Sequence, residues 1–187
     1  MQLADLAASA AENWPYWAVT VFLIVGAVID GIQLRVPNWL TLPMIAAGWI
    51  YSGIWHGGEG LVWSLVGTGV GLALLLPAYA IGGMGAGDVK MLAAVGAWVY
   101  GWHTFYAFCA STIVGAVLAV LMVVVQGRFR KHYNQFLMIW MEILTVRDPE
   151  KLSAIAAQRK PSMMLLPYGI PIAIGTIGYF AWTGMLL

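Results

Sequence analysis

Residues 89–126 read VKMLAAVGAWVYGWHTFYAFCASTIVGAVLAVLMVVVQ, an apolar run in which Lys90 is the one charged side chain. As one straight helix these 38 residues would be about 57 Å long, nearly twice the thickness of the hydrocarbon core of a bilayer. Two spans are therefore more economical, one at 89–101 and one at 104–126, joined by a turn at Gly101-Trp102-His103. The first span is only about 20 Å long, so the residues that precede it should lie below the lipid headgroups.

Four further apolar runs bring the predicted number of spans to six. Of the 187 residues, 61% are hydrophobic and 9% are charged, against roughly 25% charged in an average soluble domain. This composition excludes a soluble fold, and it leaves no room for a separate soluble domain. We expect an all-α polytopic membrane protein with a single membrane-embedded domain, 1–187, and a polar loop at about 127–162. The other spans are expected at about 16–30 or a little beyond, 39–55, 60–81 and 163–187.

The basic residues, which were not used to place the spans, predict the orientation. In the six-span arrangement all nine Lys and Arg residues fall on one face, whereas the opposite face carries Asp5, Glu12 and Glu59. Because basic residues are retained on the cytoplasmic side, we expect both termini outside, and the 127–162 loop and the glycine-rich segment before Asp88 on the cytoplasmic side. We expect a multi-pass protein of the inner, cytoplasmic membrane.

Within the polar loop, residues 136–146 (FLMIWMEILTV) are strongly apolar but too short to cross a bilayer. They follow a basic cluster, which is typical of a helix that lies on the inner leaflet. A helix packed under the bundle is the alternative.

Two carboxylates stand apart from the other acidic residues. Asp30 follows a continuous apolar run, and Asp88 follows glycines and opens the short span. Ionisable residues at membrane depth are costly and suggest function. As a structural alternative, each carboxylate caps a helix or pairs with a nearby base, Arg35 or Lys90.

The chemistry that suits two such carboxylates is aspartyl hydrolysis. Two carboxylates held close together cannot both ionise, so they share a proton. One then activates a water molecule, and the other polarises the scissile carbonyl and protonates the leaving amine. Gly85 and Gly87 would let a second backbone or a substrate strand approach the carboxylate.

Three motifs in order resemble one known family. Gly85-Ala86-Gly87-Asp88-Val89-Lys90 is similar to the GxGD signature of the type IV prepilin peptidases, which are intramembrane aspartyl proteases. Asp30 with Arg35-Val36-Pro37-Asn38 resembles the family's first aspartate and its Arg-Ile-Pro-Asn segment, with Val36 in place of isoleucine. Pro167-Tyr168-Gly169 resembles its late Pro-Tyr-Gly motif.

The resemblance implies an activity that the residues alone do not. It implies removal of the basic leader peptide from prepilin-like or pseudopilin precursors at the cytoplasmic membrane face, with Asp30 and Asp88 as the catalytic pair. Longer members also methylate the new terminus and carry a domain with paired cysteines. This sequence has one cysteine, Cys109, so it resembles the short class that serves Flp/Tad-type pili, without the methyltransferase domain. The archaeal preflagellin peptidases share the motif.

The other candidate residues have supporting roles. We expect Lys90 to contact the inner leaflet or the substrate, Asn38 to cap a helix and neighbour the site, and Tyr168 to line it. The histidines lie in separate connections without metal-ligand spacing, so we expect no metal and no cofactor. Asp148 and Glu150 interrupt the basic loop, which favours contact with the bilayer over nucleic acid. The sequence indicates no particular oligomeric state.

Two other classes of protein compete with the protease. Intramembrane carboxylates also mark proton- or ion-coupled transporters. Against that class, the acids lie near one face, and the two halves show no inverted repeat. An assembly scaffold whose acids only fix helix packing is the other alternative.

Overall fold

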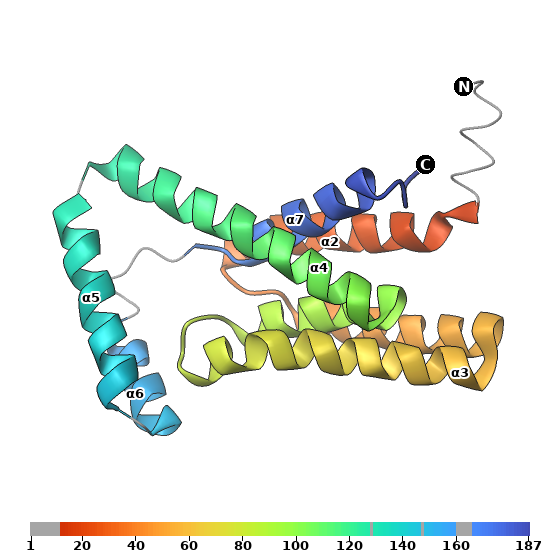
Figure 1. Cartoon of the computed structure of the whole chain (residues 1–187), viewed down its shortest axis with the longest axis horizontal. Helices are drawn as coiled ribbons and strands as arrows, with labels where there is room; N and C mark the ends of the chain where they lie inside the picture. The colour runs from red at the N-terminus through yellow and green to blue at the C-terminus, as the bar shows by residue number, and fades with distance from the viewer. Residues whose placement is uncertain (1–11, 128, 147, 160–165) are drawn as a thin grey trace.

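The computed structural model describes residues 12–127, 129–146, 148–159 and 166–187. In this part of the chain all regular structure is helical (Figure 1), and the helices are α2 (Trp14–Gln33), α3 (Asn38–Ala80), α4 (Ala86–Gln126), α5 (Phe129–Thr145), α6 (Pro149–Arg159) and α7 (Gly169–Trp182). Helices α2, α3 and α4 are long and apolar enough to cross a membrane, and α7 is a shorter apolar helix. The prediction of an all-α membrane protein is confirmed, whereas the number of spans and their orientation stay predictions.

Helix α3 is interrupted at Gly57, whose φ of 66° and ψ of −159° are not helical. The indole Nε1 of Trp49 donates a hydrogen bond of 3.0 Å to Oγ1 of Thr68. In a straight helix these two residues would be about 28 Å apart, so α3 folds back on itself at Gly57, as Figure 1 shows. The turn predicted at 56–59 is therefore confirmed.

Helix α4 is interrupted at Tyr100, with φ 65° and ψ 179°. The predicted turn at Gly101-Trp102-His103 was one residue too late. The half of α4 before the break packs against α3, where a Cβ on Gly67 would overlap the carbonyl oxygen of Gly96. The half after the break packs against α7, where Oγ of Ser111 donates to the carbonyl oxygen of Ile172.

The half of α4 before the break forms the centre of the bundle. Between Met91 and Ala97 every residue is buried, and these two side chains have no exposed surface at all. Sulfur and methyl atoms of Met91 lie just over 3 Å from the place where a Cβ on Gly26 of α2 would stand. Small residues at such contacts let helices approach closely where no hydrophobic effect drives them together.

Some helix boundaries differ from the predicted spans. Helix α2 ends at Gln33, a little beyond Asp30 as predicted, whereas α4 begins at Ala86 instead of residue 89. Asp88 therefore stands in the first turn of α4, with Gly87 beside it in the helix. The predicted start of the last span, residue 163, lies outside the described residues.

The polar loop forms α5 and α6. Figure 1 shows α5 starting beside the far end of α4, and α6 beside the other end of α5. The predicted segment 136–146 falls almost entirely in α5. Met141 and Leu144 are 65% and 66% exposed, so the protein does not cover these apolar side chains. Their exposure is in keeping with a helix that lies on a lipid surface, and that placement stays a prediction.

Candidate active site

Asp30 lies near the end of α2, and only 2% of its surface is exposed. Its Oδ2 accepts a hydrogen bond of 2.7 Å from the backbone N–H of Gly169, the first residue of α7. Helix α2 ends shortly afterwards, at Leu34, which has a left-handed backbone (φ 54°) and whose N–H donates to the carbonyl oxygen of Asp30. Asp30 is thus fixed through both its side chain and its main chain.

Asp88 lies in the first turn of α4 and is 6% exposed. Its Oδ2 accepts a hydrogen bond of 3.2 Å from the N–H of Gly85, which directly precedes the helix. A carboxylate here caps the helix and lies at the positive end of its dipole. The predicted structural role of Asp88 as a cap is therefore present, and it orients the carboxylate.

The turn that follows α2 lies against the first turn of α4. A Cβ on Gly87 would stand 2.6 Å from the carbonyl oxygen of Val36 and 2.8 Å from its nitrogen. Only glycine permits this approach. The contact brings the segment just after Asp30 beside the residue just before Asp88, so the two aspartates belong to the same end of the bundle.

Lys90 and Asn38 form a second link between these segments. The Nζ of Lys90 donates a hydrogen bond of 2.8 Å to Oδ1 of Asn38. The prediction that Asn38 caps a helix was wrong, because Pro37 holds the capping position with extended backbone and Asn38 is already helical. The Asn38 side chain instead accepts from Lys90, which ties the start of α3 to α4.

In the late Pro-Tyr-Gly motif, the glycine contacts the Asp30 carboxylate and the tyrosine side chain packs elsewhere. A Cβ on Gly169 would lie 2.9 Å from Oδ2 of Asp30, so glycine is needed where α7 meets the carboxylate. The ring of Tyr168 lies instead against Gly115 of α4. Gly169 was not among the predicted site residues, although it belongs to the Pro-Tyr-Gly motif that the sequence shows.

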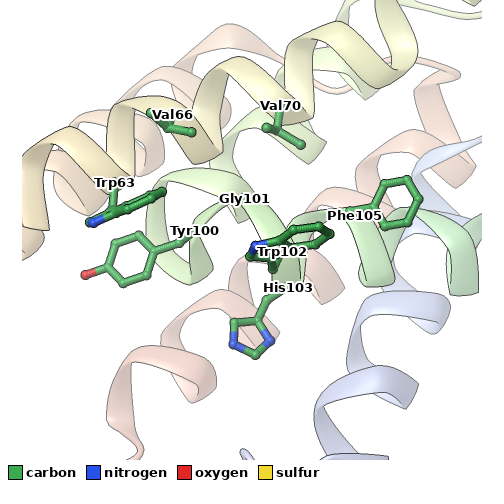
Figure 2. Close-up of a pocket in the computed structure, with 8 residues that line it drawn as sticks. All are labelled: Trp63, Val66, Val70, Tyr100, Gly101, Trp102, His103 and Phe105. Carbon is green, nitrogen blue, oxygen red and sulfur yellow. The ribbon is translucent and has the colours of Figure 1, made fainter.

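A pocket of about 590 Å³ opens at the opposite end of the first half of α4 (Figure 2). Its walls are aromatic and aliphatic, and they carry no carboxylate: Trp63, Val66, Val70, Tyr100, Gly101, Trp102, His103 and Phe105. In the described ranges no three His, Cys, Asp or Glu side chains gather as a metal site. The two buried carboxylates, Asp30 and Asp88, are not among the residues that line this pocket.

Comparison with known proteins identifies relatives of this chain. The model of the type IV leader peptidase family matches residues 17–120, which include both aspartates. A protein of Neisseria gonorrhoeae named prepilin leader peptidase/N-methyltransferase is 34% identical over 117 residues, which cover 59% of this chain and 41% of that protein. A protein of Aeromonas hydrophila with the same name is 29% identical over 117 residues, covering 58% of this chain and 40% of its own length.

No solved structure matches the chain. The match spans about two fifths of the length of these curated relatives. The family model, in contrast, covers more than half of this chain and includes most of the two helices that carry Asp30 and Asp88. The chain therefore belongs to the type IV leader peptidase family.

Proposed function

We propose that this membrane protein is an aspartyl endopeptidase that removes the leader peptide from prepilin-like precursors, with Asp30 and Asp88 as its catalytic pair. The observation that carries the proposal is the pair of buried carboxylates at one end of an apolar helical bundle. Each of them accepts a hydrogen bond from a glycine N–H, Gly169 for Asp30 and Gly85 for Asp88.

Backbone donors suit this chemistry because they fix a carboxylate oxygen in place without adding a side chain that would obstruct a substrate. In the proposed reaction one aspartate is ionised and takes a proton from water while that water attacks the peptide carbonyl. The other is protonated, polarises the carbonyl oxygen and then protonates the leaving amine. The two residues act as one titrating unit.

The substrate assignment rests on the relatives, which are named prepilin leader peptidases. We infer that this chain acts on the same class of precursor, a polypeptide with a leader ahead of an apolar helix. The proposed reaction takes place at the cytoplasmic face, because Arg35 and Lys90 lie at the aspartate end, whereas Glu59 lies beside the helix break at the other end.

Single carboxamide substitutions test the catalytic pair. Asp30→Asn and Asp88→Asn should each lower cleavage of a co-produced prepilin-like precursor by at least ~100-fold, while the protein stays in the membrane. The matched control is Glu59→Gln, because Glu59 is an exposed acid far from the site. This variant should cleave the precursor at the normal rate. Full cleavage by either aspartate variant would contradict the pair mechanism, and ion flux by reconstituted protein that cleaves nothing would favour a transporter.

Reporter fusions test the proposed orientation. A reporter that is active only outside the cytoplasm should be active at the carboxyl terminus and inactive after Gly127, at the end of α4. The reverse pattern would place the aspartates at the outer face.

A further inference from the structure

A second, apolar groove of about 470 Å³ runs between α4 and α7. Its α4 wall is one helical face from the half of α4 after the Tyr100 break, made up of Tyr106, Cys109, Ala110, Ile113 and Val114. Its α7 wall is formed by Ile174, Gly175, Gly178, Tyr179 and Trp182. None of these side chains carries a formal charge, so the groove offers no partner to a charged peptide.

The floor of the groove is built from small residues. Gly175 allows α7 to touch the backbone of Ser111, so the two walls meet closely there. Gly178 lies one turn further along α7 and opens into the groove, because a Cβ at this position would have no atom within 4 Å. Ile113 and Ile174 are 66% and 50% exposed at the edges. A floor of small residues between apolar edges is the shape that another helix packs against in a bilayer.

Helix α7 connects the groove with the proposed active site. This helix begins at Gly169, whose N–H binds Asp30, and it continues to Trp182 in the groove. With a rise of 1.5 Å per residue, the groove starts about 7.5 Å and ends about 20 Å from the Asp30 end of α7. If a substrate helix begins at the cleavage site, about its fifth to thirteenth residues would therefore lie in the groove.

We propose that the α4–α7 groove binds the apolar helix of the precursor and so positions the peptide bond that precedes this helix at Asp30 and Asp88. This inference rests on the proposed function. The apolar lining matches an apolar helix, the glycine floor permits close approach of its backbone, and α7 connects the groove to the carboxylate end. The groove thereby selects precursors by their membrane segment, separately from the recognition of the leader.

Filling the groove is the first test. Gly178→Leu adds a side chain to open space and should lower kcat/KM for a full precursor about tenfold or more. Cleavage of a short peptide that contains the leader and the scissile bond but lacks the helix should not change. The matched control is Gly69→Leu on α3, another exposed glycine with no atom within 4 Å of its Cβ position, which should cleave both substrates normally.

The chain's single cysteine, Cys109, provides a second test, because it lines the groove. In an Asp88→Asn background that keeps the precursor intact, single cysteines are introduced at the fifth to thirteenth residues of its helix and then oxidised. Disulfides with Cys109 should form at every third or fourth position of the precursor helix, because these positions share one helix face. A Cys109→Ala, Ile50→Cys variant is the control, because Ile50 is 61% exposed on α3 and should give none of them.

The outcomes separate this proposal from the proposed function. If the unsubstituted protein cleaves the precursor but Gly178→Leu does so equally well, lipid alone fills the groove and the proposal fails. An equal loss on both substrates would mean a general structural effect and would also overturn it. Disulfides that form between the Cys109 residues of two copies of this chain, and that persist when the precursor is present, would also overturn the proposal. If the unsubstituted protein cleaves no precursor, the proposed function itself fails.

Discussion

The backbone N–H of Gly169 donates a 2.7 Å hydrogen bond to Oδ2 of Asp30, a residue 139 positions earlier in the chain. The bond joins the first turn of α7 to the end of α2, so the carboxylate is oriented by a helix that is not its own. The first N–H groups of a helix have no partner within that helix, and the Asp30 carboxylate supplies one for Gly169.

Adding a methyl group at Gly169 should displace this carboxylate. In Gly169→Ala the new Cβ would lie 2.9 Å from Oδ2 and 3.0 Å from Cβ of Asp30, too close for either atom to stay in place. We expect the rate of precursor cleavage to fall by roughly 10- to 100-fold, while the amount of protein in the membrane stays normal. Gly69→Ala, which adds a methyl group to open space, should cleave at the normal rate. An unchanged rate for Gly169→Ala would show that this contact does not position Asp30.

The two glycines of the GxGD-like motif should respond differently to alanine. Gly87→Ala forces Cβ to within 2.6 Å of the Val36 carbonyl, whereas at Gly85 the nearest atom is Oδ2 of Asp88 at 3.3 Å. Backbone cannot move aside as a side chain can, so Gly87→Ala should lower the free energy of unfolding by about 1–3 kcal/mol. Gly85→Ala should change it less. Denaturant titration in detergent micelles measures both, and equal losses would contradict the proposed tight contact at Val36.

Tyr100 offers a test of the break in α4. Its φ of 65° and ψ of 179° fall in a region that is nearly exclusive to glycine. Tyr100→Gly and Tyr100→Ala both remove the ring and its contact with His56, but only glycine relieves the backbone. The glycine variant should therefore be more stable than the alanine variant by about 1 kcal/mol in thermal or denaturant unfolding. Equal stabilities would argue against strain at this residue.

Asn38 and Lys90 should prove energetically coupled. Their 2.8 Å hydrogen bond joins the start of α3 to α4, so Asn38→Ala and Lys90→Ala each remove the same interaction. A double-mutant cycle on the free energy of unfolding should give a coupling of about 0.5–1.5 kcal/mol. If the two losses simply add, the link is not present in the folded protein in detergent.

The sequence predicted the helical architecture well where composition and glycine determined it. The break at Gly57 follows directly from paired glycines between two apolar runs. The turn in α4 was predicted at Gly101-Trp102-His103 from the length of the apolar run, whereas the structure has the break at Tyr100. The contact of Tyr100 with His56, 3.3 Å across the bundle, is tertiary information that no local pattern contains.

The candidate site was predicted in part. Asp30, Asp88 and the glycines before Asp88 were identified from their position after apolar runs and from the motif. The partner of Asp30 was not, because a bond between α2 and α7 depends on how distant helices pack. The capping role expected of Asn38 also failed for a tertiary reason, since Pro37 took the capping position and Lys90 took the side-chain oxygen.

The enclosed first half of α4 has a consequence for how the protein is assembled. The part of α4 from Met91 to Ala97 is surrounded by other helices and has almost no surface left for lipid, and the half that contains it is shorter than the hydrocarbon layer is thick. Lipid contact therefore contributes little to holding it in the bilayer. We expect it to enter the membrane together with the α3 hairpin, so that its insertion is completed only when Gly67 meets Gly96.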